Sequence, residues 1–400
     1  MVAVLALLTP LAPHATGAIG REVRFDPAAP AELEMKISTS GQPLVRVAID
    51  GRDAGWFLFD TGSGGHVIDP RVARRFELEV VGRVVSKNPS SEIRTRAFGA
   101  RRMKLGPATF QRPVFTELDL SSLDQLTEPL TGEGLGGVIG FDVLASCVVE
   151  LDYRAERLAL YNPRRADDLD LPWQALVVRD DQPCVEAAFE GHHEWFLLDT
   201  GSDGGALLFS PAVERLDLLQ RETRPARASN VGGTLSYRLG LLDGFVLGGR
   251  RWDATTAQLA LADDGAHASI LPAGLFGCVY LKAFRVVIDC SRQRAAFVEH
   301  DVPQLDRELL RAYAGWYSAP GGGAYEIRRS GDRLYTPREG GGRLWLVPQN
   351  ATRFHAEDAL LQFDFHLDDA GEVTHTSIRR GGRRPRMALR REPALRGRPR

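Results

Sequence analysis

The chain has 400 residues and a formal net charge of −2 at pH 7, and its 44% hydrophobic and 26% charged residues are ordinary for a soluble globular protein. This length allows two or three domains, each with a core of its own. Beyond the N-terminus no segment approaches the roughly 18 apolar residues that a membrane-spanning helix needs, which excludes a stable membrane span.

Residues 1–20 are predicted to be a signal-like leader. An apolar stretch at residues 1–8 is interrupted by Pro10 and followed by small residues at 15–18. This order resembles the hydrophobic region and cleavage site of a secretory signal, so we expect a periplasmic or secreted protein. No Lys or Arg precedes the stretch, and the alternatives are a start codon assigned at the wrong position or a disordered leader.

Residues 33–163 are predicted to form a first β-rich repeat. Residues 44–49 alternate between apolar and polar side chains, as a half-buried strand does, and a short polar turn follows. The apolar run at 56–59 then leads into Asp-Thr-Gly-Ser at residues 60–63. An apolar pair and Gly140 come late in the repeat, which closes on a short apolar strand.

Residues 172–300 are predicted to form a second repeat, because the same features return in the same order. An alternating strand at 184–189 is followed by an apolar run and by Asp-Thr-Gly-Ser at residues 199–202. An apolar pair and Gly277 come late in this repeat too, at nearly the same distance from the aspartate. The polar link at 162–168, with its proline, marks the boundary between the repeats.

The C-terminal part of the chain has a different pattern. Short alternating strands separated by Gly-rich turns predict a small all-β domain at residues 305–393, followed by a basic tail at 394–400. Its Gly-Trp-Tyr entry at 315–317 resembles the small β domain appended to many bacterial β-lactamase-like hydrolases, a resemblance that assigns no chemistry. Ten Arg and one Glu at 379–400, among Pro and Gly, predict a solvated and poorly ordered end. No aromatic residues are interleaved with them, so no nucleic-acid partner is expected.

Metal binding is not predicted. The chain has four cysteines: Cys147, Cys184, Cys278 and Cys290. They form no CxxC pair, and all but Cys184 lie in apolar surroundings that are typical of buried hydrophobic residues. The sequence leaves a disulfide open. His66 and the His-His pair at 192–193 do not fit the H-E-x-x-H spacing and are expected at the surface or in turns. We expect no cofactor.

Two carboxylates brought face to face can hydrolyse an amide without a metal. Two such groups a few ångströms apart share one proton, because like charges at that distance cannot both ionise. The ionised group takes a proton from water, which attacks the carbonyl, while the protonated group stabilises the oxyanion. We predict that Asp60 and Asp199 form this catalytic pair.

The residues that follow each aspartate have predicted supporting roles. The glycines leave room for the opposing backbone and let its N–H groups reach the carboxylates. The threonines hydrogen-bond across the junction of the repeats, and the serines hold the outer carboxylate oxygens. These supporting residues are Thr61, Gly62, Ser63, Thr200, Gly201 and Ser202.

Together, the two motifs and the distal segments at 138–140 and 275–277 resemble the aspartic proteases, both pepsin-like and retropepsin-like. Residues 140–144 are also similar to the retropepsin G-x-[DN]-x-L run. The resemblance, to a bacterial retropepsin-like protease, implies an all-β fold in which two tandem units form an intramolecular pseudo-dimer. It further implies a monomeric aspartic endopeptidase that acts on peptides or proteins, with Gly140 and Gly277 in the ψ-loops.

Some features depart from that family. The second repeat lacks the Asp or Asn that follows the glycine in the first, and neither repeat has an evident flap tyrosine. The flaps are expected near residues 86–91 and 230–234. The alternative function is a catalytically weak or inactive peptide-binding module on the same fold. A serine hydrolase, which the C-terminal resemblance raises, is disfavoured because the chain has neither S-x-x-K nor G-x-S-x-G.

Overall fold

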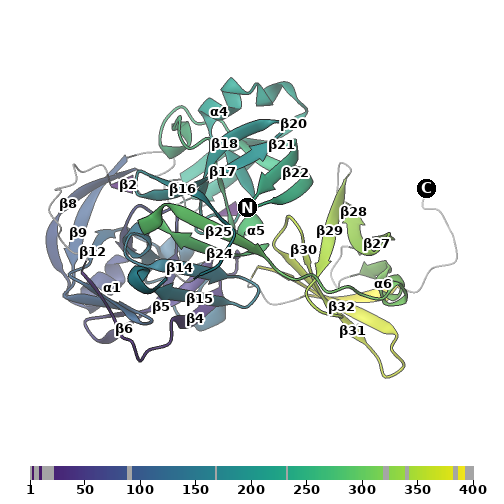
Figure 1. Cartoon of the computed structure of the whole chain (residues 1–400), viewed down its shortest axis with the longest axis horizontal. Helices are drawn as coiled ribbons and strands as arrows, with labels where there is room; N and C mark the ends of the chain where they lie inside the picture. Colours follow the sequence, from purple (N-terminus) through teal and green to yellow (C-terminus); the bar gives the residue numbers. More distant parts are fainter. Residues whose placement is uncertain are drawn as a thin grey trace. The chain divides into compact units, whose positions relative to one another are not determined.

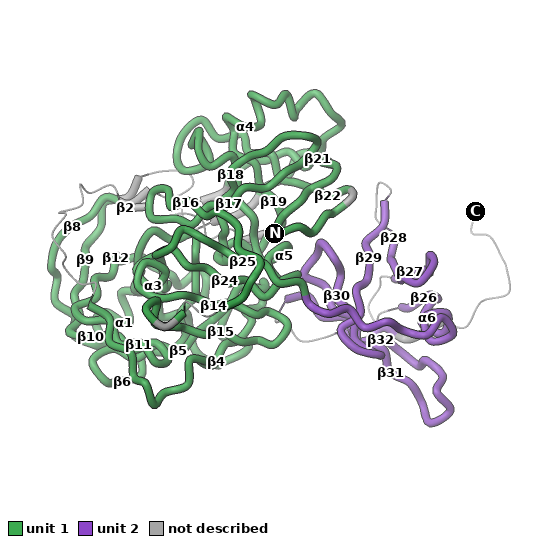
Figure 2. The backbone as a smooth tube through the Cα atoms, viewed as in Figure 1, with its two compact units in different colours: residues 1–299 green, residues 300–400 purple. Residues whose placement is uncertain are grey.

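Most of the chain is β-structure. The computed structural model describes residues 2–3, 9–10, 22–87, 92–166, 169–230, 233–318, 324–337, 342–381 and 386–391. The chain divides into two compact units, residues 1–299 and residues 300–400 (Figures 1 and 2). In the described ranges, no helix is long and apolar enough to cross a membrane.

The first half of unit 1 is a set of short strands with three short helices between them. Its strands are β3 Val23–Phe25, β4 Glu32–Ile37, β5 Pro43–Ile49, β6 Arg52–Phe59, β7 His66–Ile68, β8 Glu79–Lys87, β9 Glu92–Gly99, β10 Arg102–Leu105, β11 Ala108–Gln111, β12 Val114–Glu117, β13 Gly137–Ile139, β14 Val148–Asp152 and β15 Arg157–Tyr161. Its helices are α1 Pro70–Arg75, α2 Glu128–Thr131 and α3 Phe141–Leu144.

The second half has the same kind of composition, with longer hairpin strands. Its strands are β16 Trp173–Arg179, β17 Gln182–Phe189, β18 His192–Leu198, β19 Ala206–Leu208, β20 Thr223–Asn230, β21 Gly233–Leu247, β22 Arg250–Ala260, β23 Gly274–Phe276, β24 Phe284–Asp289 and β25 Arg294–Glu299. Its helices are α4 Ser210–Arg215 and α5 Cys278–Leu281.

Each aspartate motif follows the second strand of a tight hairpin. β5 and β6 are joined at Asp50 and Gly51, whose φ angles of 50° and 81° fit a two-residue hairpin turn. β17 and β18 are joined in the same way at Glu190 and Gly191, with φ angles of 49° and 83°. The apolar ends of β6 and β18 are buried, so each hairpin delivers its motif to the interior.

The strand before each distal glycine lies beside the strand before each aspartate. β13 runs parallel to β6, with Ile139 opposite Phe59, and antiparallel to β7. β23 runs parallel to β18, with Phe276 opposite Leu198, and antiparallel to β19. Sequence-distant glycines are therefore brought next to the two aspartate motifs.

One sheet connects the two halves of unit 1. Its central pair is β14 and β24, which run antiparallel with Val149 opposite Ile288. β15 and β4 continue it on the side of the first half, and β25 and β16 on the side of the second (Figure 1). The halves thus share backbone hydrogen bonds as well as side-chain contacts.

The two predicted flap regions lie at the ends of hairpins. β8 pairs with β9, and β20 pairs with β21. Residues 88–91 and 231–232, which are part of the expected flaps, lie outside the described residues. Of the predicted leader, only β1 Val2–Ala3 and β2 Thr9–Pro10 are described, and they pair with β20 and β8 respectively.

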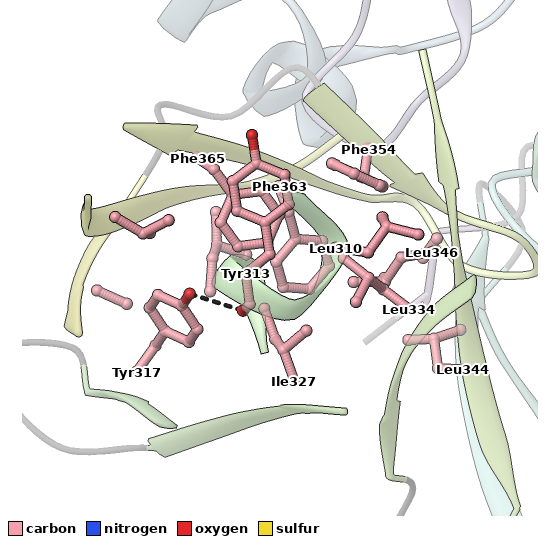
Figure 3. Packing of buried hydrophobic residues seen from close by; sticks show 14 residues of the cluster. Leu310, Tyr313, Tyr317, Ile327, Leu334, Leu344, Leu346, Phe354, Phe363 and Phe365 are labelled. Atoms are coloured by element: carbon pink, nitrogen blue, oxygen red, sulfur yellow. Dashed lines mark hydrogen bonds between the residues drawn. The ribbon is translucent and has the colours of Figure 1, made fainter. Parts of the chain in front are cut away.

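Unit 2 contains a closed barrel of eight strands. They are β26 Gly315–Ser318, β27 Ala324–Ser330, β28 Arg333–Pro337, β29 Arg343–Pro348, β30 Arg353–Ala356, β31 Leu361–Leu367, β32 Val373–Arg380 and β33 Arg386–Arg391. The barrel encloses an aromatic core in which Tyr313 stacks on Phe365 at 4.2 Å between ring centroids, and the Tyr317 hydroxyl donates to the Tyr313 carbonyl (Figure 3).

Two features of unit 2 differ from the sequence-based expectation. Helix α6 Arg307–Tyr313, capped by the Asp306 side chain, precedes the barrel, where only strands were expected. Part of the arginine-rich end is also ordered, because β33 pairs with β32 and β26 and closes the barrel. The expectation of a poorly ordered end is therefore wrong for the residues of β32 and β33, because the backbone of an arginine pairs as that of any other residue does. The tail at 394–400 lies outside the described residues.

The four cysteines are free thiols, which answers the disulfide question that the sequence leaves open. Cys147, Cys184 and Cys278 are buried, and Cys290 is partly buried.

Candidate active site

Asp60 and Asp199 lie at the buried ends of β6 and β18. Their side chains are 2% and 0% exposed. The backbone N–H of Asp60 donates to the Ile139 carbonyl at 2.9 Å, and that of Asp199 donates to the Phe276 carbonyl at 2.9 Å. The parallel strand next to each aspartate therefore fixes where its loop begins.

Backbone N–H groups of its own loop hold each carboxylate. Gly62 N–H donates to Asp60 Oδ1 at 2.8 Å. Gly201 N–H and Ser202 N–H donate to Asp199 Oδ1 at 2.9 and 3.1 Å. Such bonds orient a carboxylate and favour its charged form.

Each carboxyl also lies against the glycine of the opposite loop. A Cβ atom placed on Gly62 would lie 2.6 Å from Asp199 Oδ1, and one placed on Gly201 would lie 2.6 Å from Asp60 Oδ1. Only glycine permits this approach, so the structure brings the two aspartates together at the junction of the halves.

Thr61 and Thr200 make the hydrogen bonds across the junction that the sequence predicts. Each backbone N–H donates to the hydroxyl of the other threonine, at 3.0 Å in both directions. The Thr61 hydroxyl donates to the Leu198 carbonyl at 2.5 Å, and the Thr200 hydroxyl donates to the Phe59 carbonyl at 2.6 Å. These reciprocal bonds fix one loop against the other.

Burial governs the electrostatics of the pair. Burial raises the pKa of Asp60 to about 7, against the opposing effect of the backbone N–H groups. Burial and the neighbouring Asp60 carboxyl raise the pKa of Asp199 well above its ordinary value. Among the described residues, Asp199 Oδ2 is buried without a hydrogen-bond partner. Near neutral pH, the two carboxyls therefore titrate as a coupled pair that retains a proton.

The serine hydroxyls have a different role from the predicted one. The Ser63 hydroxyl donates its single proton to the Gly65 carbonyl at 2.8 Å, so it cannot donate to a carboxylate. The Ser202 hydroxyl accepts from Gly204 N–H at 3.4 Å, while the Ser202 backbone N–H binds Asp199. Both hydroxyls close the turn of their own loop.

Gly140 and Gly277 pack against these turns. A Cβ on Gly140 would lie 2.7 Å from the Ser63 carbonyl oxygen, and one on Gly277 would lie 2.7 Å from the Ser202 carbonyl oxygen. The residue after each glycine donates its backbone N–H to the same serine carbonyl, at 2.9 Å in both halves. The distal glycines thus allow a second segment to support each loop.

His66 is buried on β7, so the prediction of a surface or turn histidine is wrong. Its side chain is enclosed because Nδ1 accepts the Gly140 N–H at 3.2 Å and the ring packs beside Phe115. Burial lowers the pKa of His66 and keeps the imidazole neutral. In the second half, the N–H of Gly277 donates instead to the Gly205 carbonyl at 2.9 Å, so a backbone group takes the place of the imidazole.

Four further residues at the junction are not predicted from the sequence. Gln42 Nε2 donates to the Gly201 carbonyl at 3.3 Å, and Gln182 Nε2 donates to the Gly62 carbonyl at 2.5 Å. The Cys278 thiol donates to the Thr200 carbonyl at 3.2 Å and lies 3.2 Å from the Tyr153 hydroxyl. For the glutamines a signal exists, since Gln-Pro precedes both alternating strands, at 42–43 and 182–183. At the positions that match Tyr153 and Cys278, the other half has Cys290 and Phe141, so the sequence repeat does not reveal this contact.

No group of three or more His, Cys, Asp and Glu side chains could hold a metal ion within the part of the chain that the structure describes.

The first aspartate loop and its distal glycine fall within one recognised domain. Residues 45–143 match the family model of an aspartyl protease. Residues 299–396, which include the barrel of unit 2, match a domain of unknown function, DUF3471. No curated protein matches the chain. The first half of unit 1 is thus similar to an aspartyl protease domain, and aspartyl proteases are hydrolases. The matched residues do not include Asp199.

Proposed function

We propose that the protein is an aspartic endopeptidase in which Asp60 and Asp199 form one catalytic dyad. The observation that carries the proposal is the matched pair of loops, each pressed against the opposite carboxyl and bonded through Thr61 and Thr200. On this proposal the two halves of unit 1 are tandem retropepsin-like units that form an intramolecular pseudo-dimer. A single chain then supplies the whole active site and acts as a monomer.

We assign the base to Asp60 and the acid to Asp199, a choice in line with the directions of the two pKa shifts. Ionised Asp60 takes a proton from a water held between the carboxyls, and the water oxygen attacks the carbonyl carbon of the peptide bond. Protonated Asp199 donates a hydrogen bond to the developing oxyanion. The proton that Asp60 received then passes to the leaving nitrogen as the C–N bond breaks, which yields a carboxylic acid and an amine.

An extended peptide is the substrate class that the hairpins favour. The chain's own N-terminal residues add strands to both hairpin edges: Thr9 and Pro10 lie opposite Lys87 and Ser86 on β8, and Val2 and Ala3 lie opposite Ala228 and Ser229 on β20. Edges that accept an extended segment of this chain have the backbone geometry to accept a peptide substrate.

The same edges would serve a second function, a peptide-binding module that does not cleave. Strand pairing with β8 and β20 provides binding whether or not the carboxyls act on the peptide. The two functions differ in whether the aspartates change the covalent structure of the ligand.

Digestion of a mixed peptide library between pH 4 and 9 tests the proposal. We expect endoproteolytic products whose rate falls about tenfold per pH unit below 7, because Asp60 must be ionised to act as the base. Asp60→Asn and Asp199→Asn should each reduce cleavage by about a thousandfold or more, while the exposed Asp264→Asn should not.

Cleavage that persists in either dyad variant refutes the proposal. Peptide binding by the wild-type protein without any cleavage, at any pH in that range, identifies the binding module instead.

A further inference from the structure

Two buried glutamines occupy corresponding places at the entrance to β5 and β17. Gln42 is 0% exposed and Gln182 is 4% exposed, and a proline follows each of them. Buried amides need hydrogen-bond partners, and a partner within the same half would satisfy that need. The NH₂ group of each side chain nevertheless crosses the junction to the loop of the opposite half.

The carbonyl that each glutamine binds belongs to the peptide unit beside the opposite aspartate. Gln42 binds the carbonyl of Gly201, and the N–H of that same peptide unit, on Ser202, donates to Asp199 Oδ1 at 3.1 Å. A peptide unit is planar, so a fixed carbonyl fixes the direction of the N–H at its other end. A hydrogen bond to the carbonyl also polarises the unit and strengthens the N–H as a donor.

A related arrangement exists on the other side. Gln182 binds the carbonyl of Gly62, and the N–H of that peptide unit, on Ser63, donates to the backbone carbonyl of Asp60 at 3.3 Å. That N–H is one of the groups that oppose the rise in the pKa of Asp60. Gln42 is therefore two hydrogen bonds away from the Asp199 carboxyl, and Gln182 holds the loop that carries Asp60.

The direction of the Gln42 amide is set by its own surroundings. The Ser38 hydroxyl donates to Gln42 Oε1 at 2.5 Å, and the Gln42 backbone N–H donates to the Ser38 hydroxyl oxygen at 3.0 Å. With its oxygen engaged there, the side chain presents its NH₂ group to Gly201. A continuous series of hydrogen bonds then runs from Ser38 through Gln42 and the Gly201–Ser202 peptide unit to Asp199.

We propose that Gln42 and Gln182 are positioning residues of the dyad, each of which holds, across the junction, the peptide unit that borders the opposite aspartate. The expected loss of kcat rests on the proposed peptidase function. The placement of the two carboxyls can be tested without any cleavage, by their titration. Neither glutamine touches the reacting atoms, so each acts through the loop that it holds.

The other titratable groups around the dyad do not obscure the influence of the two glutamines on the titration of Asp60 and Asp199. They are Tyr153, Cys278, His66, Asp142 and Asp203. Burial raises the pKa of the Tyr153 hydroxyl and of the Cys278 thiol, so both remain neutral up to pH 9. His66 is neutral, and the partly exposed Asp142 and Asp203 are common to every variant compared.

Gln42→Met and Gln182→Met test the proposal, because methionine fills a similar volume without an N–H donor. Gln220→Met, at an exposed position, is the matched control. The readout is the pH titration of the Asp60 and Asp199 side chains by ¹³C NMR, assigned with the two Asp→Asn variants. It is combined with kcat and KM for a cleaved peptide.

We expect a crossed pattern. Gln42→Met should raise the ionisation midpoint of Asp199, and Gln182→Met that of Asp60, by roughly half a pH unit, because each weakens an N–H bond to the charged form. kcat should fall by about tenfold to a hundredfold with little change in KM, since the substrate edges are intact while the carboxyls are less well placed. Gln220→Met should behave as wild type.

Unchanged titration of both carboxyls in folded Gln42→Met and Gln182→Met proteins would overturn the inference, as would an equal shift in the control. If the methionine variants do not fold, Ser38→Ala is the test, because it removes the hydrogen bond that orients the Gln42 amide. It should raise the ionisation midpoint of Asp199, as Gln42→Met would. An unchanged midpoint of Asp199 in Ser38→Ala overturns the inference. A wild-type protein that cleaves no peptide refutes the proposed function, and the NMR titration then still tests the glutamines.

Discussion

Replacing Thr200 by valine should lower the free energy of unfolding of unit 1 by more than most single substitutions do. The change keeps the shape of the side chain and removes its hydroxyl. Two buried bonds disappear with it: the one that the hydroxyl accepts from Thr61 N–H at 3.0 Å and the one that it donates to the Phe59 carbonyl at 2.6 Å. Thr200 is 1% exposed, so water does not replace them.

The size of the effect follows from these two bonds. Each intramolecular hydrogen bond contributes about 1 kcal/mol net, and a buried group left without a partner adds about 1–3 kcal/mol. The two lost bonds contribute about 2 kcal/mol, and the N–H and the carbonyl left without a partner add about 2–6 kcal/mol, so we expect the free energy of unfolding to fall by at least about 4 kcal/mol. Thr61→Val should have a similar effect, because its hydroxyl accepts and donates in the same way.

Urea unfolding followed by tryptophan fluorescence measures the loss, with Trp56 and Trp195 lying on the two hairpins that carry the loops. Thr109→Val, at a half-buried position on β11, is the control and should change stability by less than about 0.5 kcal/mol. The double variant should lose less than the sum of the two single ones, since both remove parts of one network. A loss below about 1 kcal/mol for Thr200→Val, or strict additivity, would refute this reasoning.

Three other predictions concern pH, the C-terminal unit and location. Because burial raises the pKa of both aspartates, the folded protein retains protons that the unfolded chain releases. The stability that these groups contribute is therefore complete below about pH 4 and is lost as pH rises through about 7. The Asp60→Asn, Asp199→Asn double variant should show a flatter dependence in urea titrations, and an unchanged slope would contradict the assignment. A chain that ends at Val302, just beyond unit 1, should fold and cleave short peptides at the full-length rate; a folded but inactive product would show that unit 2 completes the site. Cell fractionation should find a shortened protein outside the cytoplasm, and full-length protein in the cytosol would contradict an export signal.

The aspartates and their glycines could be predicted because their chemistry is local in sequence. An apolar strand, an acidic residue and a glycine turn lie within ten residues, and their repetition shows that the two loops belong together. The strands beside them follow from alternating patterns, and β5 and β15 lie close to where the patterns place them. The match to an aspartyl protease family over residues 45–143 agrees with this part of the prediction.

The contacts that the sequence does not reveal join residues that are far apart along the chain. Gln42 and its partner Gly201 are separated by 159 positions, and Gln182 and Gly62 by 120. His66 was misplaced for the same reason, because its buried ring accepts a hydrogen bond from the N–H of Gly140, which lies 74 positions further along the chain. β33 lies within the predicted all-β domain at 305–393, but its arginines favoured a poorly ordered segment, because composition describes side chains whereas barrel closure depends on backbone pairing.

The sheet that connects the two halves has a consequence for how the junction responds to dilution. When two separate subunits each supply one carboxyl, the intact pair is lost at concentrations below their dissociation constant. Here β14 and β24 belong to one polypeptide, and their pairing is a step in the folding of that polypeptide. The local concentration of one loop around the other is thus set by the length of chain between them and not by the amount of protein in solution. The carboxyl pair should therefore persist at any dilution at which unit 1 remains folded.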